Sequence, residues 1–218
     1  GPTYSEYERE VTMDGGRCHY FSLTEDSSFR LDVPALTEEL SHNVDLLILC
    51  NPNNPTSSVI PRNQMRDILD YCKKKSITVL VDETYVEFAP DVQAVTAIPL
   101  TEYYNNIIIL RGISKFFAAP GLRLGYAICG NKDLLKEINQ KKNPWTINSL
   151  AAIAGEIMFS DEEYIRKTRQ LIAGERERVC QAIRSMDAYQ VYESNCNFVL
   201  VKIKKEGLTA DQIFDTAI

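Results

Sequence analysis

Short continuous runs of apolar residues alternate along the chain with segments whose apolar residues recur at helical spacing. The runs cover residues 45–50, 77–81, 107–110 and 124–129. Each run is too short for a typical helix and apolar on both faces, so it predicts a strand covered on both sides. Between the first two runs, residues 62–75 carry Met65, Ile68, Leu69 and Cys72 at helical spacing. This order of elements is typical of an α/β fold with a mostly parallel sheet flanked by helices.

The pattern changes after residue 148. A helix rich in small residues is followed by a long charged helix, expected from Asp161 to about Met186. Residues 197–203 then alternate between apolar and polar, as in a half-exposed strand. The change predicts a partial large domain over residues 1–160, and a linking helix with an incomplete, smaller α+β domain over residues 161–218.

Both ends of the chain are unusual for natural termini. The sequence opens with Gly1 and has no initiator Met. A last helix is predicted after Thr209, a plausible N-cap, but it ends on Ile218 without a glycine, a basic turn or a proline. We therefore interpret the chain as a fragment of a longer polypeptide.

Composition excludes several classes of protein. The net charge is −6 and the basic residues form no stripe, which argues against a nucleic-acid partner. No apolar run approaches the ~18 residues that a membrane span requires, so we expect no membrane partner. The six cysteines contain no Cys-x-x-Cys pair and only two histidines could join them, so we expect no metal site. Dispersed cysteines suggest reduced thiols and a cytoplasmic location.

Polar residues follow three of the predicted strands at the point where each strand ends. They occupy residues 51–56, 82–85 and 111–115, with a further group at 120–123. Each segment alone could be an ordinary turn, cap or solvated surface, but the carboxyl ends of parallel strands meet at one edge of a sheet. The set contains an amide, a carboxylate, a phenol, a hydroxyl, an amine and a guanidinium, which suits an anionic aromatic cofactor better than a metal. Glycine-rich phosphate loops of nicotinamide or nucleotide enzymes are absent.

Four motifs in this order resemble a known family. They are Asn51-Pro-Asn-Asn-Pro-Thr56, Asp82-x-x-Tyr85, Ser114-Lys115 and Gly121-Leu-Arg-Leu-Gly-Tyr126. Together they resemble the class I/II aminotransferases, which are fold-type I pyridoxal 5'-phosphate (PLP) enzymes. Residues 115–126 and 144–148 are most similar to the branch of histidinol-phosphate aminotransferase and threonine-phosphate decarboxylase. The resemblance extends from Pro2 to about Ile203.

The resemblance implies a catalytic role for one lysine. Lys115 would form a Schiff base with the cofactor aldehyde and move a proton between the substrate Cα and the cofactor. Asp82 would pair with the pyridinium nitrogen, so that the ring can accept electrons. The large domain would then be the cofactor-binding domain.

The resemblance also implies how the rest of the cofactor would be held. Asn54 and Tyr85 would hydrogen-bond to the 3-oxygen of the ring. Ser114 and Arg123 would hold the phosphate, Arg123 through a charge-assisted hydrogen bond. Tyr4 would stack on the face of the ring.

The chain departs from the family pattern at several positions. Ser57 stands where the family usually has a glycine, and Gly112 stands where it usually has a threonine or serine that binds the phosphate. Residues 198–218 contain no arginine to bind a substrate carboxylate. The family's N-terminal third, which cradles the phosphate and forms part of the dimer contact, has no counterpart here. We therefore expect an enzymatic parent protein and little or no activity of this fragment. A cis peptide bond is expected between Asn54 and Pro55.

By resemblance, the parent protein is a homodimeric aminotransferase of amino-acid biosynthesis that acts on an amino acid and a 2-oxo acid. The reaction would be ping-pong transamination, with histidinol-phosphate aminotransfer as one form of it. A PLP-dependent decarboxylase of threonine phosphate is an alternative in the same cofactor class. A catalytically silent binding or regulatory relative is an alternative from another class. Retention of Lys115, Asp82 and Arg123 together argues against the silent relative.

Overall fold

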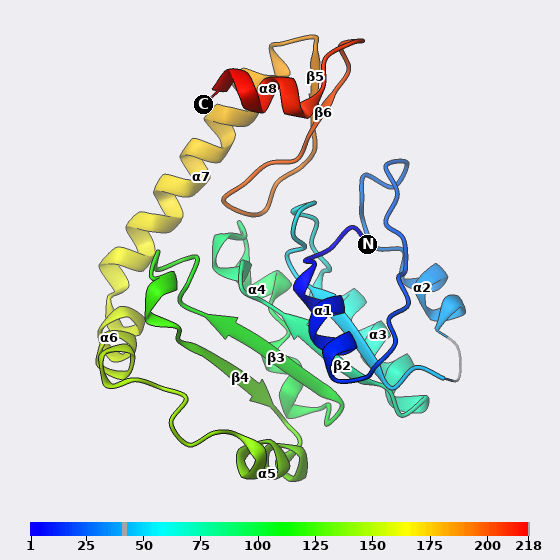
Figure 1. Ribbon diagram of the computed structural model, residues 1–218, viewed down its shortest axis with the longest axis vertical. Helices are drawn as coiled ribbons and strands as arrows, with labels where there is room; N and C mark the ends of the chain where they lie inside the picture. Colours follow the sequence, from blue (N-terminus) through cyan, green and yellow to red (C-terminus); the bar gives the residue numbers. More distant parts are fainter. Residues whose placement is uncertain (41–42, 218) are drawn as a thin grey trace.

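Four strands form the central sheet of a computed structural model that describes residues 1–40 and 43–217 (Figure 1). They are β1 (Leu46–Cys50), β2 (Thr78–Asp82), β3 (Ile107–Gly112) and β4 (Gly125–Cys129), paired in that order. The first three strands are parallel, and β4 is antiparallel to β3. The expected mostly parallel α/β sheet is therefore confirmed.

The main core lies between one face of this sheet and helix α3 (Arg62–Lys74). The helix buries the four residues that its apolar spacing marked, namely Met65, Ile68, Leu69 and Cys72. They pack in one cluster with alternate residues of the two central strands, Val79, Val81, Ile107 and Ile109. Because side chains alternate along a strand, Asp82 points to the opposite face from Val81. Helix α1 (Glu6–Met13) lies over that opposite face (Figure 1).

Short elements surround the sheet. They are α2 (Val33–Glu39), η1 (Val86–Phe88), α4 (Val92–Val95), η2 (Ile98–Glu102), η3 (Pro120–Leu122), α5 (Lys132–Lys141) and α6 (Ser149–Ser160). In the described part of the chain, no helix has the length and apolarity needed to cross a membrane.

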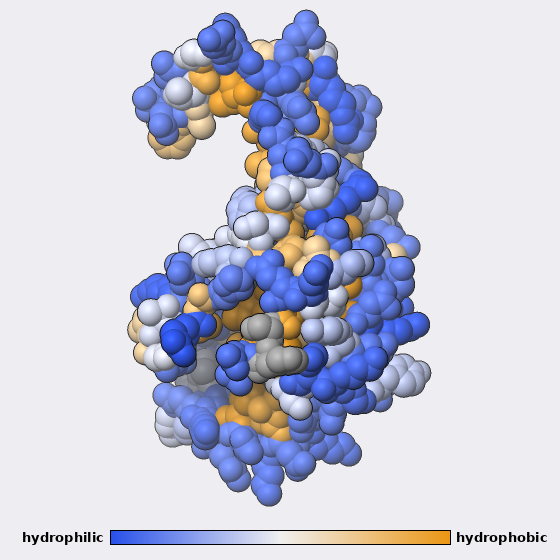
Figure 2. All heavy atoms as spheres, turned by 90° about the vertical axis from the view of Figure 1, so that its right-hand side faces the viewer, coloured by the Kyte–Doolittle hydropathy of each residue, from blue (hydrophilic) through white to orange (hydrophobic). Residues whose placement is uncertain are grey.

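Helix α7 (Glu162–Arg184) leads from the sheet to the C-terminal elements (Figure 1). Its 23 residues span about 35 Å at the rise of an α-helix. Beyond it, β5 (Tyr189–Val191) and β6 (Val201–Ile203) form an antiparallel pair, followed by α8 (Ala210–Ala217). In the space-filling view these elements stand at one end of the molecule, joined to the rest by a narrower part (Figure 2). The last residue of the predicted final helix, Ile218, lies outside the described residues.

The expected strand over residues 197–203 was wrong in its first half. Only Val201–Ile203 pair with another strand. The residues just before the predicted strand, 194–196, contact the loop after β1. There the backbone N–H of Asn195 donates a hydrogen bond to Ser57 Oγ at 2.7 Å. This long-range contact has no signature in the local alternation of residues.

Candidate functional site

Asp82 is the last residue of β2, and both of its carboxylate oxygens are held in place. Oδ1 accepts hydrogen bonds from the backbone N–H of Thr84 at 2.9 Å and from Thr84 Oγ1 at 2.5 Å. Oδ2 accepts a hydrogen bond from the hydroxyl of Tyr7 at 2.6 Å. Bonds between hydroxyl donors and an ionised acceptor are among the stronger hydrogen bonds in proteins. The carboxylate is therefore fixed at the C-terminal edge of the sheet.

Tyr7 is a residue that the sequence analysis missed. It lies in α1, and burial, followed by the nearby Cys50 thiol and the Asp82 carboxylate, raises its pKa far above the usual value. The phenol therefore stays protonated and donates to Asp82. Its ring also packs edge to face against Tyr4, with the ring centroids 5.5 Å apart. The three-residue spacing of the two tyrosines at the start of a helix was the one available signal.

The loop after β1 uses one of its asparagines only as scaffolding. Asn51 is fully buried, its Nδ2 donates to the carbonyl of Ile60 at 3.0 Å, and its Oδ1 accepts from the N–H of Ile60 at 2.8 Å. The side-chain amide of Asn54, in contrast, makes no hydrogen bond within the described part of the chain. It is therefore free to bind a ligand. The peptide bond before Pro55 is cis, as expected.

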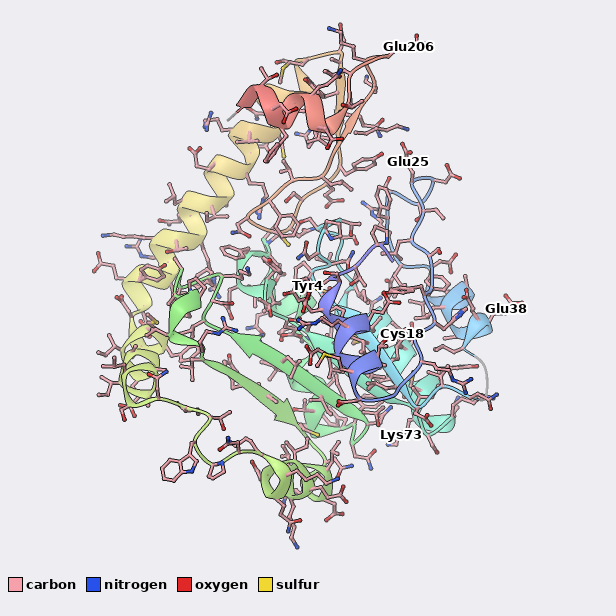
Figure 3. The ribbon with its side chains drawn as sticks, in the orientation of Figure 1. Tyr4, Cys18, Glu25, Glu38, Lys73 and Glu206 are labelled. Atoms are coloured by element: carbon pink, nitrogen blue, oxygen red, sulfur yellow. The ribbon has the colours of Figure 1, made fainter. Side chains whose placement is uncertain are left out.

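A second asparagine of this loop connects it to the segment that carries Tyr4. Asn53 Nδ2 donates to the carbonyl of Pro2 at 3.0 Å, and Oδ1 accepts from Thr3 Oγ1 at 3.1 Å. These bonds fix the two residues that directly precede Tyr4. Figure 3 shows Tyr4 at the N-terminal end of α1, on the face of the sheet turned toward the viewer. Asn53 thus holds the Tyr4 segment against the loop that carries Asn54.

Lys115 and Tyr85 meet at the same edge of the sheet. Lys115 lies in the turn after β3, and its Nζ is 5.9 Å from the centroid of the Tyr85 ring. Burial raises the pKa of Tyr85, and the nearby Asp82 carboxylate acts in the same direction. The hydroxyl of Tyr85 makes no hydrogen bond to any described residue. Tyr85 is therefore near both the amine of Lys115 and the carboxylate of Asp82.

Among the described residues, no side-chain hydrogen bond or ion pair joins the two predicted phosphate ligands to this group. Ser114 precedes Lys115 in the same turn and makes no side-chain hydrogen bond within the described part of the chain. Arg123 is exposed, has a left-handed backbone with φ of 54°, and donates from Nη1 to the carbonyl of Pro120 at 2.9 Å. Their roles stay predictions.

The absence of a hydroxyl at position 112 has a steric explanation. Gly112 pairs with Gly125 across β3 and β4. A β-carbon added to Gly112 would lie 3.3 Å from the carbonyl oxygen of Leu124, and one added to Gly125 would lie 3.2 Å from that of Arg111. These distances are tighter than ordinary contacts, so the close approach of the two strands favours glycine at both positions.

The second residue of the Asp82 motif has a structural role on the other face. The Glu83 side chain is fully buried, and its Oε2 accepts hydrogen bonds from Nε and Nη2 of Arg111 at 3.0 and 2.7 Å. Burial lowers the pKa of Arg111, but its ion pair with Glu83 more than offsets this, and the pKa is raised overall. Glu83 directly follows Asp82, and Arg111 lies four residues before Lys115. The ion pair therefore joins the ends of β2 and β3 next to these two residues.

The chemistry of these side chains suits a flat anionic molecule. A fixed carboxylate can pair with a cationic ring nitrogen, the free amide of Asn54 and the phenol of Tyr85 can hydrogen-bond to a ring oxygen, and the amine of Lys115 can react with an aldehyde. The residues of this set come from three strand ends and the segment before α1. The donor groups fit an aromatic aldehyde that carries negative charge.

Several known proteins have sequences similar to that of this chain. The family model described as aminotransferase class I and II matches residues 1–216. The threonine-phosphate decarboxylase of Salmonella typhimurium is 32% identical over 207 residues, which cover 95% of this chain and 56% of that protein. The histidinol-phosphate aminotransferase of Ruminiclostridium cellulolyticum is 33% identical over 205 residues, which cover 93% of this chain and 55% of that protein. The chain thus spans about half the length of these relatives.

A solved structure confirms the fold. The histidinol-phosphate aminotransferase of Clostridium acetobutylicum superimposes with a TM-score of 0.92 at 29% sequence identity. The superposition covers 99% of this chain and 63% of that one. Taken with the family match along nearly its whole length, these likenesses establish that the chain belongs to the class I and II aminotransferases.

Proposed function

We propose that this chain carries the PLP site of an enzyme that transfers an amino group between an amino acid and a 2-oxo acid. The observation that carries the proposal is the group formed by Asp82, Tyr85 and Lys115 at one edge of the sheet. Membership of the class I and II aminotransferases supports the same function. Histidinol phosphate, a phosphorylated amino alcohol that takes the place of the amino acid, is the proposed amino-group donor, since histidinol-phosphate aminotransferases are similar to this chain in both sequence and structure.

Each residue of the group has a distinct proposed task. PLP, when bound, supplies a ring that draws electrons away from the α-carbon of the substrate. Lys115 attaches the cofactor and then accepts and returns a proton at that α-carbon. Asp82 holds a proton on the ring nitrogen, and the hydrogen bonds from Tyr7 and Thr84 keep its carboxylate in position.

The remaining predicted residues orient the cofactor. Asn54 and Tyr85 would donate hydrogen bonds to the ring 3-oxygen, and Tyr4 would cover one face of the ring. Ser114 and Arg123 would bind the phosphate, Arg123 in exchange for its hydrogen bond to the carbonyl of Pro120.

An activity assay with a matched variant tests the proposal. The full-length protein should consume histidinol phosphate only when PLP and a 2-oxo acid are both present. Lys115→Ala should abolish this turnover and the PLP absorbance change that depends on the lysine. Lys132→Ala, which removes an exposed lysine of α5, should leave both unchanged. Full turnover by Lys115→Ala would refute the assignment.

Decarboxylation of threonine phosphate is a second candidate. The similarity to the Salmonella typhimurium decarboxylase favours it to nearly the same degree. Carbon dioxide released from threonine phosphate without a 2-oxo acid would identify this reaction and exclude transamination as the main activity. A protein that neither binds PLP nor turns over either substrate would be a silent relative.

We further propose homodimer assembly and a cytoplasmic location. Helix α6 supports assembly, because its apolar residues Leu150, Ile153 and Ile157 are largely exposed. The six free cysteines are consistent with a reducing compartment. Light scattering of the full-length protein tests the assembly.

A further inference from the structure

The loop that carries Asn54 is fastened to the C-terminal elements at Ser57. Ser57 is fully buried, and its Oγ accepts a hydrogen bond from the backbone N–H of Asn195 at 2.7 Å. The same Oγ lies 3.1 Å from Ser194 Oγ. The carbonyl of Ser57 accepts a second hydrogen bond from Asn195, through Nδ2 at 3.0 Å. Asn195 is only 8% exposed, so these bonds are shielded from water.

Ser57 also closes the turn that presents Asn54. Its backbone N–H donates to the carbonyl of Asn53 at 2.7 Å, which encloses residues 54–56 in one tight turn. Ser57 and Asn54 therefore belong to the same turn. The side-chain amide of Asn54 has no partner of its own within the described part of the chain, and its backbone is held by this turn and by a hydrogen bond to the Cys50 thiol.

The backbone conformation of Ser57 favours glycine, so the serine there points to a structural role of its hydroxyl. Its φ is 59°, in the left-handed region that glycine adopts without strain and that costs other residues free energy. A glycine here could not accept the hydrogen bond from Asn195, and a buried N–H would be left without a partner. Serine therefore combines the turn with a contact to a distant segment.

The same distant segment is tied to the other side of the candidate site. Nη1 of Arg176, in α7, donates to the carbonyls of Phe88 and Cys196, both at 3.0 Å. Phe198 packs edge to face on Tyr85, with the ring centroids 5.1 Å apart. Residues 194–198 thus touch both the Asn54 loop and the Tyr85 segment.

We propose that Ser57 and Asn195 form a latch that fixes the Asn54 loop through the C-terminal elements. Ser57 is a positioning residue, since it acts on a ligand only through Asn54. The consequence for PLP binding rests on the function proposed above, whereas the latch itself is a property of the cofactor-free protein.

Amide hydrogen exchange in the cofactor-free protein tests the latch directly. In Ser57→Ala, the amide of Asn195 should exchange about tenfold faster or more, as expected when a buried hydrogen bond is lost. Ser58→Ala is the matched control, because the hydrogen bond of the Ser58 hydroxyl among the described residues stays within the same loop, to Thr56 Oγ1 at 2.8 Å. It should leave the exchange of Asn195 unchanged.

PLP affinity, measured by equilibrium dialysis, tests the positioning role. Ser57→Ala should weaken binding about three- to tenfold, as for the loss of one positioned hydrogen bond, while Ser58→Ala binds like the wild type. Ser57→Gly should unfold at higher denaturant concentration than Ser57→Ala, because the strain is relieved, yet bind PLP as weakly. This combination separates the hydroxyl contact from stability.

The outcomes are distinguishable. Unchanged exchange of Asn195 in Ser57→Ala would overturn the latch, and so would an equal acceleration in Ser58→Ala. Wild-type PLP affinity in Ser57→Ala would overturn the positioning role. If the wild type bound no PLP, the proposed function would fall, and the exchange measurement would still decide on the latch.

Discussion

At the scale of single residues, the hydrogen bond from Tyr7 to Asp82 is the contact that most directly shapes the candidate site. It joins α1 to the end of β2 across 75 residues of sequence. Tyr7→Phe should lower the free energy of unfolding by about 1.5–3 kcal/mol, the range for a hydrogen bond to a charged group. Urea denaturation measures this. Tyr20→Phe removes an exposed hydroxyl that donates to Glu8, and should leave the midpoint unchanged.

The same tyrosine makes stability depend on pH in the alkaline range. Its pKa is raised in the folded protein, chiefly by burial, from an ordinary value of 10. A raised pKa means that folding favours the protonated phenol, so its contribution is complete below pH 10 and is lost as the pH rises above 10. The wild type should therefore lose stability above pH 10 more steeply than Tyr7→Phe. Parallel slopes would contradict the assignment.

Candidate site residues could be predicted from the sequence only where they belong to a motif of contiguous residues. The polar residues after each strand were found because strand ends of a parallel sheet converge. Tyr7, Asn53 and Ser57 were missed or left unexplained, because each acts through a partner at least 50 residues away. Arg123 was located, but its side-chain direction is set by the local turn at Pro120.

At the scale of elements, a buried ion pair joins the two strands that carry the site. Glu83→Gln should lower the free energy of unfolding by about 1.5–3 kcal/mol, because it weakens the charge-assisted hydrogen bonds to Arg111, which keeps its second ion pair with Glu87. The double variant Glu83→Gln/Arg111→Met should recover part of this loss. Removing Glu175, whose partner Arg178 lies exposed on the same helix, is the control and should have no measurable effect. Equal stability of Glu83→Gln and the wild type would contradict this account.

The elements themselves were largely predictable. Buried strands and helix α3 followed from apolar runs and apolar spacing, since the core requires these patterns. The strand predicted over residues 197–203 was too long, because Phe198 packs on the Tyr85 ring and its carbonyl accepts a hydrogen bond from Ser194 Oγ, so residues 197–200 do not extend β6. Alternation of apolar and polar residues indicates that a segment is half exposed. It does not indicate which other segment of the chain packs against it.

At the scale of the whole molecule, helix α7 connects the sheet to the C-terminal elements, and Arg176 reinforces this connection. Arg176→Ala removes the hydrogen bonds to the carbonyls of Phe88 and Cys196. Limited proteolysis should then cut residues 185–210 faster than in the wild type, because local opening requires less free energy. Arg178→Ala, on the exposed side of the same helix, should be cut at the wild-type rate. Equal cleavage rates of Arg176→Ala and Arg178→Ala would show that Arg176 does not stabilise the contact between the sheet and the C-terminal elements.

The central claim is that Lys115 and Asp82 belong to one PLP site, and chemical labelling tests it most directly. The protein is incubated with PLP, reduced with borohydride, digested, and mapped by mass spectrometry. We predict that Lys115 is the main labelled lysine, and that its labelling falls at least tenfold in Asp82→Ala but not in Asp67→Ala, an exposed position of α3. Labelling spread over surface lysines, or labelling of Lys115 that does not respond to Asp82→Ala, would contradict the account.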